Sequence, residues 1–175
     1  MAKILIVYST TDGHTLTICN RLKQDIERNG HAVTVLSVAD CPGEELRAAD
    51  KVVVGASIRY GRHSPPLVDF VGRHHSLLAS RPNAFFSVSI VARKPEKNTP
   101  DTNPYLHKFL RQIAWRPAHL AVFAGKLGYP RYGFFDRQMI RLIMLITRGP
   151  TDPATVVDFT DWNKVADFAQ LVSEI

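Results

Sequence analysis

The chain has 175 residues, enough for one domain with a full core, and its 45% hydrophobic and 22% charged residues are ordinary for a globular protein. The formal net charge of +6 suits an anionic small molecule, a nucleic acid or an acidic membrane surface. No basic run, zinc-ligand spacing or aromatic–basic strand motif accompanies this charge, so we expect no nucleic-acid partner. The two cysteines lack metal-ligand spacing, so we expect reduced thiols and no bound metal. The first residues lack a secretory signal pattern, so we expect a cytoplasmic location.

The first predicted strand runs into a hydroxyl-rich turn. Residues 3–8 are apolar and rich in β-branched side chains, and residues 16–29 carry apolar side chains at helical spacing. A strand, a turn and a helix in this order present unpaired backbone N–H groups and the positive end of a helix dipole, which together bind anions. The turn has neither the Gly-Lys-Ser/Thr of a triphosphate loop nor the Gly-x-Gly-x-x-Gly of a dinucleotide loop. A site for one terminal phosphate is therefore predicted at Ser9, Thr10, Thr11, Asp12, Gly13, His14 and Thr15. A turn that only caps the helix is the alternative.

The same turn resembles the signature of the flavodoxins. In that family an aromatic residue ends the first strand and is followed by x-Ser/Thr-x-x-Gly-x-Thr, a pattern that Tyr8, Thr10, Gly13 and Thr15 meet here. The family motif wraps the phosphate of FMN, so the resemblance implies FMN as the cofactor. Ile18 departs from the small residue that is usual three positions after the last threonine, a difference that concerns helix packing more than phosphate contacts.

Strands and helices alternate along the rest of the chain. Further apolar runs predict strands buried on both faces, at residues 31–38, 50–57, 84–91 and 119–125. Capping residues followed by proline, and the cap Thr160, predict helices at residues 65–78, 106–113 and 161–175. The alternation predicts an α/β flavodoxin-like fold, a doubly wound five-stranded parallel sheet of order 2-1-3-4-5.

Two loops should meet the phosphate turn, because ligands of such sheets bind outside the carboxyl ends of the strands, where the winding reverses. The loop after the third strand offers Ser57, Ile58, Arg59, Tyr60 and Gly61. Tyr60 is suited to stack on the isoalloxazine ring and Gly61 to let the backbone approach it closely, although a surface tyrosine in a turn is the alternative.

The loop after the fourth strand begins with Val91, Ala92, Arg93 and Lys94, where flavodoxins place the second wall around the flavin. Positive charge at Arg93 and Lys94 would favour an anionic reduced flavin or a carboxylate substrate. A solvated charged loop is the alternative. We therefore expect Val91, Ala92, Arg93 and Lys94 to belong to the cofactor site.

An insert follows the fifth strand, at residues 126–150, within what we expect to be a single domain covering residues 1–175. It is basic and amphipathic, with Asp136 as its one acidic residue. Arg137, Arg141 and Arg148 fall at offsets of four and seven, which predicts one stripe on a helix. The apolar run is too short to span a bilayer, so the helix can bury in protein, cover a ligand or lie in a membrane interface. We expect Arg131 and the three arginines of the stripe to contact substrate or membrane.

Five segments resemble the bacterial quinone-dependent protoporphyrinogen IX dehydrogenases, namely residues 55–61, 91–97, 112–117, 129–132 and 160–162. The resemblance implies an FMN enzyme of haem biosynthesis that oxidises protoporphyrinogen IX to protoporphyrin IX with menaquinone or ubiquinone. It also implies a peripheral protein at the cytoplasmic face of the inner membrane, with an anionic membrane surface as partner. The flavin carries the chemistry, and no side chain is predicted as a general base. A flavodoxin-type electron carrier, a general flavin quinone reductase and a membrane module with a vestigial flavin site stay open as alternatives.

Overall fold

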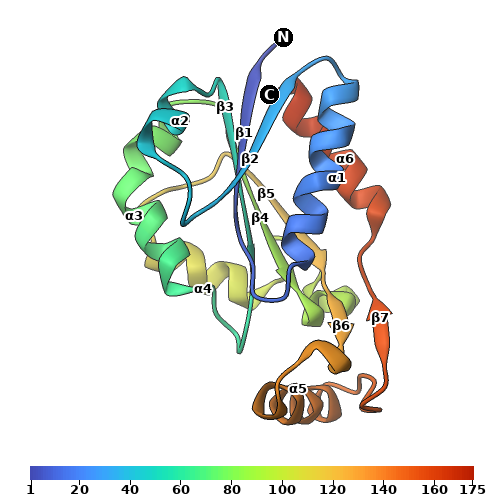
Figure 1. Cartoon of the computed structure of the whole chain (residues 1–175). Helices are drawn as coiled ribbons and strands as arrows, with labels where there is room; N and C mark the ends of the chain where they lie inside the picture. The colour runs from blue at the N-terminus through green and yellow to red at the C-terminus, as the bar shows by residue number, and fades with distance from the viewer.

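The computed structural model describes all 175 residues and has a central sheet of five parallel strands. The strand order is β2-β1-β3-β4-β5, as the sequence predicts (Figure 1). The strands are β1 (Lys3–Ser9), β2 (Ala32–Ser37), β3 (Lys51–Ser57), β4 (Asn83–Ser89) and β5 (His119–Ala124). The winding reverses between β1 and β3, which pair in parallel from Ile4 with Lys51 to Ser9 with Ala56. The carboxyl ends of these two strands therefore flank the edge where a ligand is expected.

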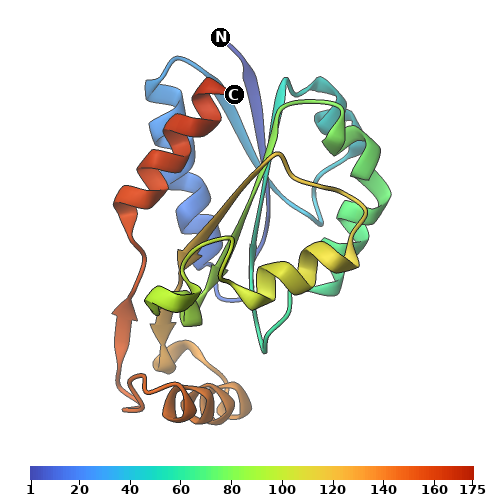
Figure 2. The ribbon, with the colours of Figure 1, turned by 180° about the vertical axis from the view of Figure 1, so that it is seen from behind.

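Helices cover both faces of this sheet. Helices α1 and α6 lie on one face, and α2, α3 and α4 lie on the other (Figures 1 and 2). The helices are α1 (His14–Arg28), α2 (Gly43–Ala48), α3 (Pro65–Ala79), α4 (Pro104–Gln112) and α6 (Trp162–Glu174). Strand side chains alternate between the two faces, so Ile4 and Ile6 pack toward α1 and α6 while Leu5 and Val7 pack toward α3 and α4. The short helix α2 was not predicted, because its six residues are too few to show a helical period.

Capping side chains fix where two of the helices begin. The Asn103 side chain accepts hydrogen bonds from two backbone N–H groups in the first turn of α4, at 3.1 and 3.0 Å. Asp161 does the same for α6, at 3.1 and 3.3 Å. The sequence placed this second cap one residue early, at Thr160, whose hydroxyl instead donates to the Ala124 carbonyl at 2.8 Å. That bond ties the start of α6 to the end of β5.

The fourth strand is shorter than predicted. It ends at Ser89, and the chain then forms two short 3-10 turns, η1 (Ile90–Arg93) and η2 (Pro95–Lys97). On the neighbouring strand, a methyl group at Gly55 would lie 2.0 Å from the Cζ atom of Phe86. Glycine is needed there because the Phe86 ring packs directly against the backbone of β3.

The insert is larger than the predicted 126–150 and forms a separate layer beyond the carboxyl ends of the strands (Figure 1). Its elements are β6 (Lys126–Gly128), η3 (Tyr129–Arg131), α5 (Phe134–Ile146) and β7 (Val156–Asp158). Strands β6 and β7 pair in antiparallel fashion, so the insert closes only at Asp158. A small cluster of buried side chains holds α5 on this hairpin, made of Leu127, Tyr129, Tyr132, Ile140 and Met144.

Candidate active site

The loop between β1 and α1 has the features of an anion site. Gly13 has a φ of +87°, a left-handed conformation that glycine adopts without strain. Helix α1 begins directly after it, at His14, so the unpaired N–H groups of the first helical turn border the loop. The first turn carries no acidic side chain, so nothing in it neutralises the positive end of the helix dipole.

Two threonine hydroxyls of this loop remain available to a ligand. The Thr15 side chain is fully buried, and its Oγ1 atom has no hydrogen-bond partner in the protein. An unsatisfied buried hydroxyl costs about 1–3 kcal/mol, so an acceptor oxygen from a ligand would remove that cost. The Oγ1 atom of Thr10 accepts a hydrogen bond from the Gly13 N–H at 3.0 Å and keeps its own hydrogen to donate. The loop is therefore suited to a terminal phosphate.

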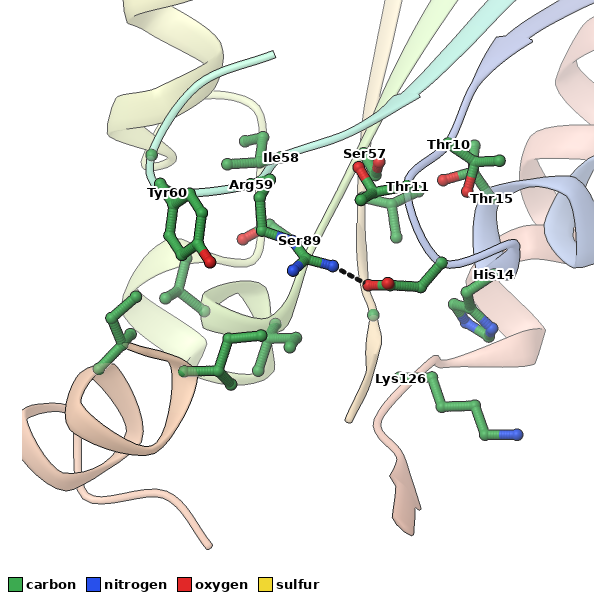
Figure 3. Close-up of a pocket in the computed structure, with 18 of the residues that line it drawn as sticks. Thr10, Thr11, His14, Thr15, Ser57, Ile58, Arg59, Tyr60, Ser89 and Lys126 are labelled. Carbon is green, nitrogen blue, oxygen red and sulfur yellow. Dashed lines mark hydrogen bonds and ion pairs between the residues drawn. The ribbon is translucent and has the colours of Figure 1, made fainter. Parts of the chain in front are cut away.

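A pocket of about 490 Å³ extends from this loop across the carboxyl ends of β3 and β4 to helix α5. Figure 3 shows Thr10, Thr11 and Thr15 on one side of it and Ile58 and Tyr60 on the other. The predicted residues that line it are Thr10, Thr11, Asp12, His14, Thr15, Ser57, Ile58, Arg59, Tyr60, Gly61 and Val91. The structure thus brings together the two loops that the sheet order placed at one edge.

Other lining residues were missed by the sequence analysis. They are Val88, Ser89, Ile90, Tyr105, Gly125, Lys126, Tyr132, Met139, Ile140, Ile143 and Met144. Ser89 and Gly125 could have been predicted, because ligands lie at the carboxyl ends of the strands, and Ser89 ends β4 while Gly125 directly follows β5. The four α5 residues fit one of the three interpretations of the insert, that it covers a ligand. Tyr105 has no comparable signal in the sequence.

Five predicted cofactor residues do not line the pocket, namely Ser9, Gly13, Ala92, Arg93 and Lys94. The Ser9 hydroxyl pairs with that of Ser64 at 2.8 Å, which joins the loop to the start of α3. The Arg93 guanidinium donates to the Ile90 carbonyl at 3.1 Å, and to the carbonyl and hydroxyl of Thr147 at 3.1 and 3.0 Å. Arg93 thus fastens the end of α5 to η1, because three acceptors lie within its reach there.

An ion-pair network joins the phosphate loop, the loop after β3 and the insert. The Arg59 guanidinium pairs with Asp12, and it lies 3.5 Å from an Asp136 carboxylate oxygen on α5. Figure 3 shows the Arg59 side chain reaching across the pocket toward the phosphate loop. Burial alone lowers the pKa of Arg59, but the charge and hydrogen bond of Asp12, with smaller contributions from Tyr60 and Asp136, raise it overall. Arg59 is therefore a fixed cation that balances two carboxylates.

Tyr60 lies next to this network at the rim of the pocket. Its φ of 52° is left-handed, an uncommon conformation for a residue with a side chain. Its hydroxyl donates a hydrogen bond to Asp136. Burial and that carboxylate raise the pKa of Tyr60, so the phenol stays protonated and remains a donor. The residue is 45% exposed and borders the pocket, as a residue that covers a flat ligand requires.

Neither histidine near the pocket is placed as a proton donor or acceptor for a ligand. The His14 Nε2 atom lies 2.6 Å from the Thr160 hydroxyl, and burial lowers the pKa of His14 against the opposing charge of Asp158. His63 is buried between the Ser57 carbonyl, at 3.1 Å, and the Ser87 hydroxyl, at 3.3 Å. Burial lowers the pKa of His63 to about 4, so both rings are neutral near pH 7.

Only two residues of the predicted arginine stripe, Arg137 and Arg141, lie on helix α5. Helix α5 ends at Ile146, and Arg148 follows it with a left-handed φ of 57°. Arg137 donates to carbonyls of Tyr129 and Tyr132, both at 3.3 Å, and Arg141 donates to the Thr151 carbonyl at 2.9 Å. Arg137 and Arg141 therefore stabilise the insert itself, because the carbonyls of its irregular turns lie within their reach. Arg131 is exposed and lies beside His14 and Lys126.

The outer face of α5 is apolar and exposed. Side chains at helical spacing there are 83% exposed at Phe135, 49% at Leu142, 67% at Leu145 and 73% at Ile146. The neighbouring Phe134 is 71% exposed. No helix of the protein combines the length and apolar character that a bilayer-crossing segment requires. So large an apolar group on one helix is typical of an interaction surface.

The chain matches the flavodoxin domain family over residues 5–154. It is 45% identical to protoporphyrinogen IX dehydrogenase (quinone) of Escherichia coli strain K12, over 99% of this chain and 96% of that protein. It is 46% identical to the Leishmania major protein of the same name, over 95% of this chain and 73% of that protein. The chain belongs to the flavodoxin-like protoporphyrinogen IX dehydrogenase family. The structure of oxidised Flavodoxin 1 from Bacillus cereus has the same fold, with a TM-score of 0.54 at 14% identity over 99% of this chain and 98% of that one.

The cofactor of the flavodoxin family is FMN, and the residues of the phosphate loop in this chain fit it. The orphaned Thr15 hydroxyl, the free hydrogen of Thr10 and the uncapped start of α1 offer donors to a phosphate without a full positive charge. Ile58 and Tyr60 offer apolar and aromatic surface to a flat ring at the other end of the same pocket.

Proposed function

We propose that this protein oxidises protoporphyrinogen IX to protoporphyrin IX with FMN as cofactor and a membrane quinone as electron acceptor. The observation that carries the proposal is 45% identity, over 99% of the chain, to a protein named for this reaction. The phosphate loop supports it independently, because its buried, unpartnered Thr15 hydroxyl lacks a ligand oxygen that FMN has. A vestigial flavin site would give no reason to keep this unsatisfied donor.

The protein's own contribution is binding and orientation. FMN, when bound, supplies two-electron redox chemistry, so the loss of six electrons and six protons from the porphyrinogen requires three cycles and three quinones. Thr10, Thr15 and the start of α1 would hold the phosphate, and Tyr60 and Ile58 would cover the ring. Arg59 neutralises Asp12, which would otherwise repel the phosphate. No side chain is assigned as a general base, since His14 and His63 are both engaged in the protein.

We further propose that the protein acts as one domain bound peripherally to the cytoplasmic face of the inner membrane, through the outer face of α5. Five exposed apolar side chains on a helix of 13 residues support contact with a lipid interface. The sequence assigned this contact to the arginine stripe, but Arg137 and Arg141 are bonded within the insert. Arg131 and Arg148, both exposed, remain the cations for anionic headgroups.

A turnover assay tests the proposal. Purified holoprotein is given protoporphyrinogen IX and a quinone without oxygen, and the fluorescence of protoporphyrin IX is followed. We expect three quinols for each porphyrin formed. A flavodoxin-type carrier would bind FMN and show no porphyrin formation, and a general quinone reductase would reduce quinone with a nicotinamide donor but not with porphyrinogen.

A further inference from the structure

The part of the pocket that α5 lines has an apolar wall, and we call this part the compartment beside α5. Met139, Ile140, Ile143 and Met144 lie at offsets of one, four and five, so they share the face of α5 that lines the pocket. The loop after β3 and Tyr105 of α4 line the same pocket. This wall has only hydrocarbon and thioether groups, with no charge and no hydrogen-bond donor. It is suited to a flat, uncharged ring, because methionine side chains adapt to such surfaces.

One residue connects this compartment to the exposed apolar face of the insert. Met139 lines the pocket and is 46% exposed at the same time. Leu142, one turn away, is 49% exposed on the outer side. An apolar molecule that contacts the outer face of α5 would therefore have a route into the pocket past Leu142 and Met139.

We propose that this compartment binds the ring of the quinone acceptor, with Met139 at its entrance, an inference that rests on the proposed function. The charges of the two substrates favour this assignment. The porphyrinogen carries two propionates, which need cations, whereas a quinone is neutral. No cation is among the four side chains of the α5 wall, and three neighbouring arginines are engaged elsewhere, since Arg137 and Arg141 donate to backbone carbonyls and Arg59 pairs with Asp12. The quinone takes up two electrons and two protons there and leaves as a quinol.

Separate half-reactions test the assignment. The holoprotein is reduced with dithionite, and its reoxidation by tetramethyl-1,4-benzoquinone is followed by stopped flow. Reduction of the oxidised holoprotein by protoporphyrinogen IX is measured in a second experiment. Met139→Glu places a charge at the entrance and should slow reoxidation at least tenfold, with reduction by porphyrinogen within twofold of the parent. Gln138→Glu adds the same charge at the adjacent exposed residue outside the pocket and serves as the matched control.

A labelling experiment gives a readout that does not depend on turnover. Both natural thiols are buried, and burial raises their pKa values, to about 11 for Cys41, so they react slowly. A Met139→Cys variant should react readily with a maleimide. The fully substituted quinone, which has no open ring position for thiol addition, should protect this thiol at least fivefold and leave a Gln138→Cys variant unprotected.

Two results would overturn the assignment. One is reoxidation of Met139→Glu within twofold of the parent, together with no protection of the Met139→Cys thiol. The other is slower reduction of Met139→Glu by porphyrinogen while its reoxidation rate stays that of the parent, which would mean that the compartment binds the porphyrinogen. Failure of the proposed function looks different, because the parent itself would then not be reduced by porphyrinogen, while dithionite-reduced protein would still report on the quinone.

Discussion

The Tyr60 hydroxyl donates a hydrogen bond to Asp136, and this contact joins the loop after β3 to a helix that is 76 residues away in sequence. The left-handed backbone of Tyr60 is strained for a residue with a side chain, so the contact helps to hold a conformation that the chain would otherwise leave. The insert therefore shapes the wall of the cofactor pocket as well as closing it.

We expect Asp136→Ala to remove the hydrogen bond that holds Tyr60 and to weaken FMN binding by about three- to tenfold. This is the effect expected from losing one hydrogen bond to a charged group in a partly exposed site. Tyr60→Phe is the matched control, because it removes the same bond and keeps the ring. Titration of apoprotein with FMN, followed by flavin fluorescence, measures both. Tyr60→Ala should also relieve quenching of the flavin by the phenol. Equal quenching in Tyr60→Ala and the parent would mean that the ring does not cover the flavin.

The phosphate loop gives the second prediction. Thr10→Ala combined with Thr15→Ala removes two hydroxyl donors, each worth about 1.5–3 kcal/mol toward a charged group. The FMN dissociation constant should rise by at least a hundredfold. Riboflavin, which lacks the phosphate, is the control ligand and should bind the parent and the double variant equally. A parallel loss of riboflavin binding would instead indicate a loop that no longer folds.

The sequence predicted half of the residues that line the pocket, because the signals of the two loops that carry them are local. Thr10, Gly13 and Thr15 lie within six residues, and β3 and β1 must be neighbours in a 2-1-3-4-5 sheet, which brings Tyr60 to the phosphate loop. The direction of the Arg93 side chain was not predicted, since it depends on Thr147, an acceptor 54 residues away. A local pattern shows that a residue is charged but not which distant carbonyl lies within its reach.

The insert shows the same limit. Its helical period was visible, but the end of α5 was not, because Arg148 takes a left-handed position that glycine usually occupies. Strands β6 and β7 have three residues each, too few for a period of two to stand out. Their pairing, which carries the insert to Asp158, is a tertiary contact.

Buried His63 gives a pH dependence of stability. Its pKa is lowered from 6.5 to about 4 in the folded protein, so the unfolded chain binds the extra proton between these two pH values. Stability should therefore be unaffected by His63 above about pH 6.5 and fall as the pH drops toward 4, by about 3 kcal/mol in all. Urea denaturation at several pH values measures the change. A His63→Gln variant, although less stable throughout, should lose this part of the slope.

Arg93 gives a prediction on the attachment of the insert. Arg93→Ala removes two hydrogen bonds between η1 and Thr147 at the end of α5, so residues 147–150 should be cleaved at least tenfold faster by a protease under native conditions. Lys94→Ala, the neighbouring change outside the pocket, is the control. FMN affinity should change little in either variant, since neither side chain lines the pocket. A large loss of FMN in Arg93→Ala alone would restore its predicted place at the flavin.

The proposed membrane contact through the outer face of α5 gives the last prediction. Burial of each large apolar side chain in a lipid interface contributes up to about 1.5–3 kcal/mol. A variant with Phe135→Ser, Leu145→Ser and Ile146→Ser should therefore lose cosedimentation with vesicles of either neutral or anionic lipid.

Variants of the arginines separate charge from apolar contact. Reversal of Arg131 and Arg148 to Glu should lower binding to anionic vesicles only. This difference in binding between variant and parent should disappear in high salt, because salt screens the attraction. Reversal of Arg137 and Arg141 should instead destabilise the insert, since their guanidinium groups hold its carbonyls. Cosedimentation at low and high salt, beside thermal unfolding, separates the three variants. Unchanged vesicle binding of the triple serine variant at high salt would show that the apolar face of α5 is not the membrane contact.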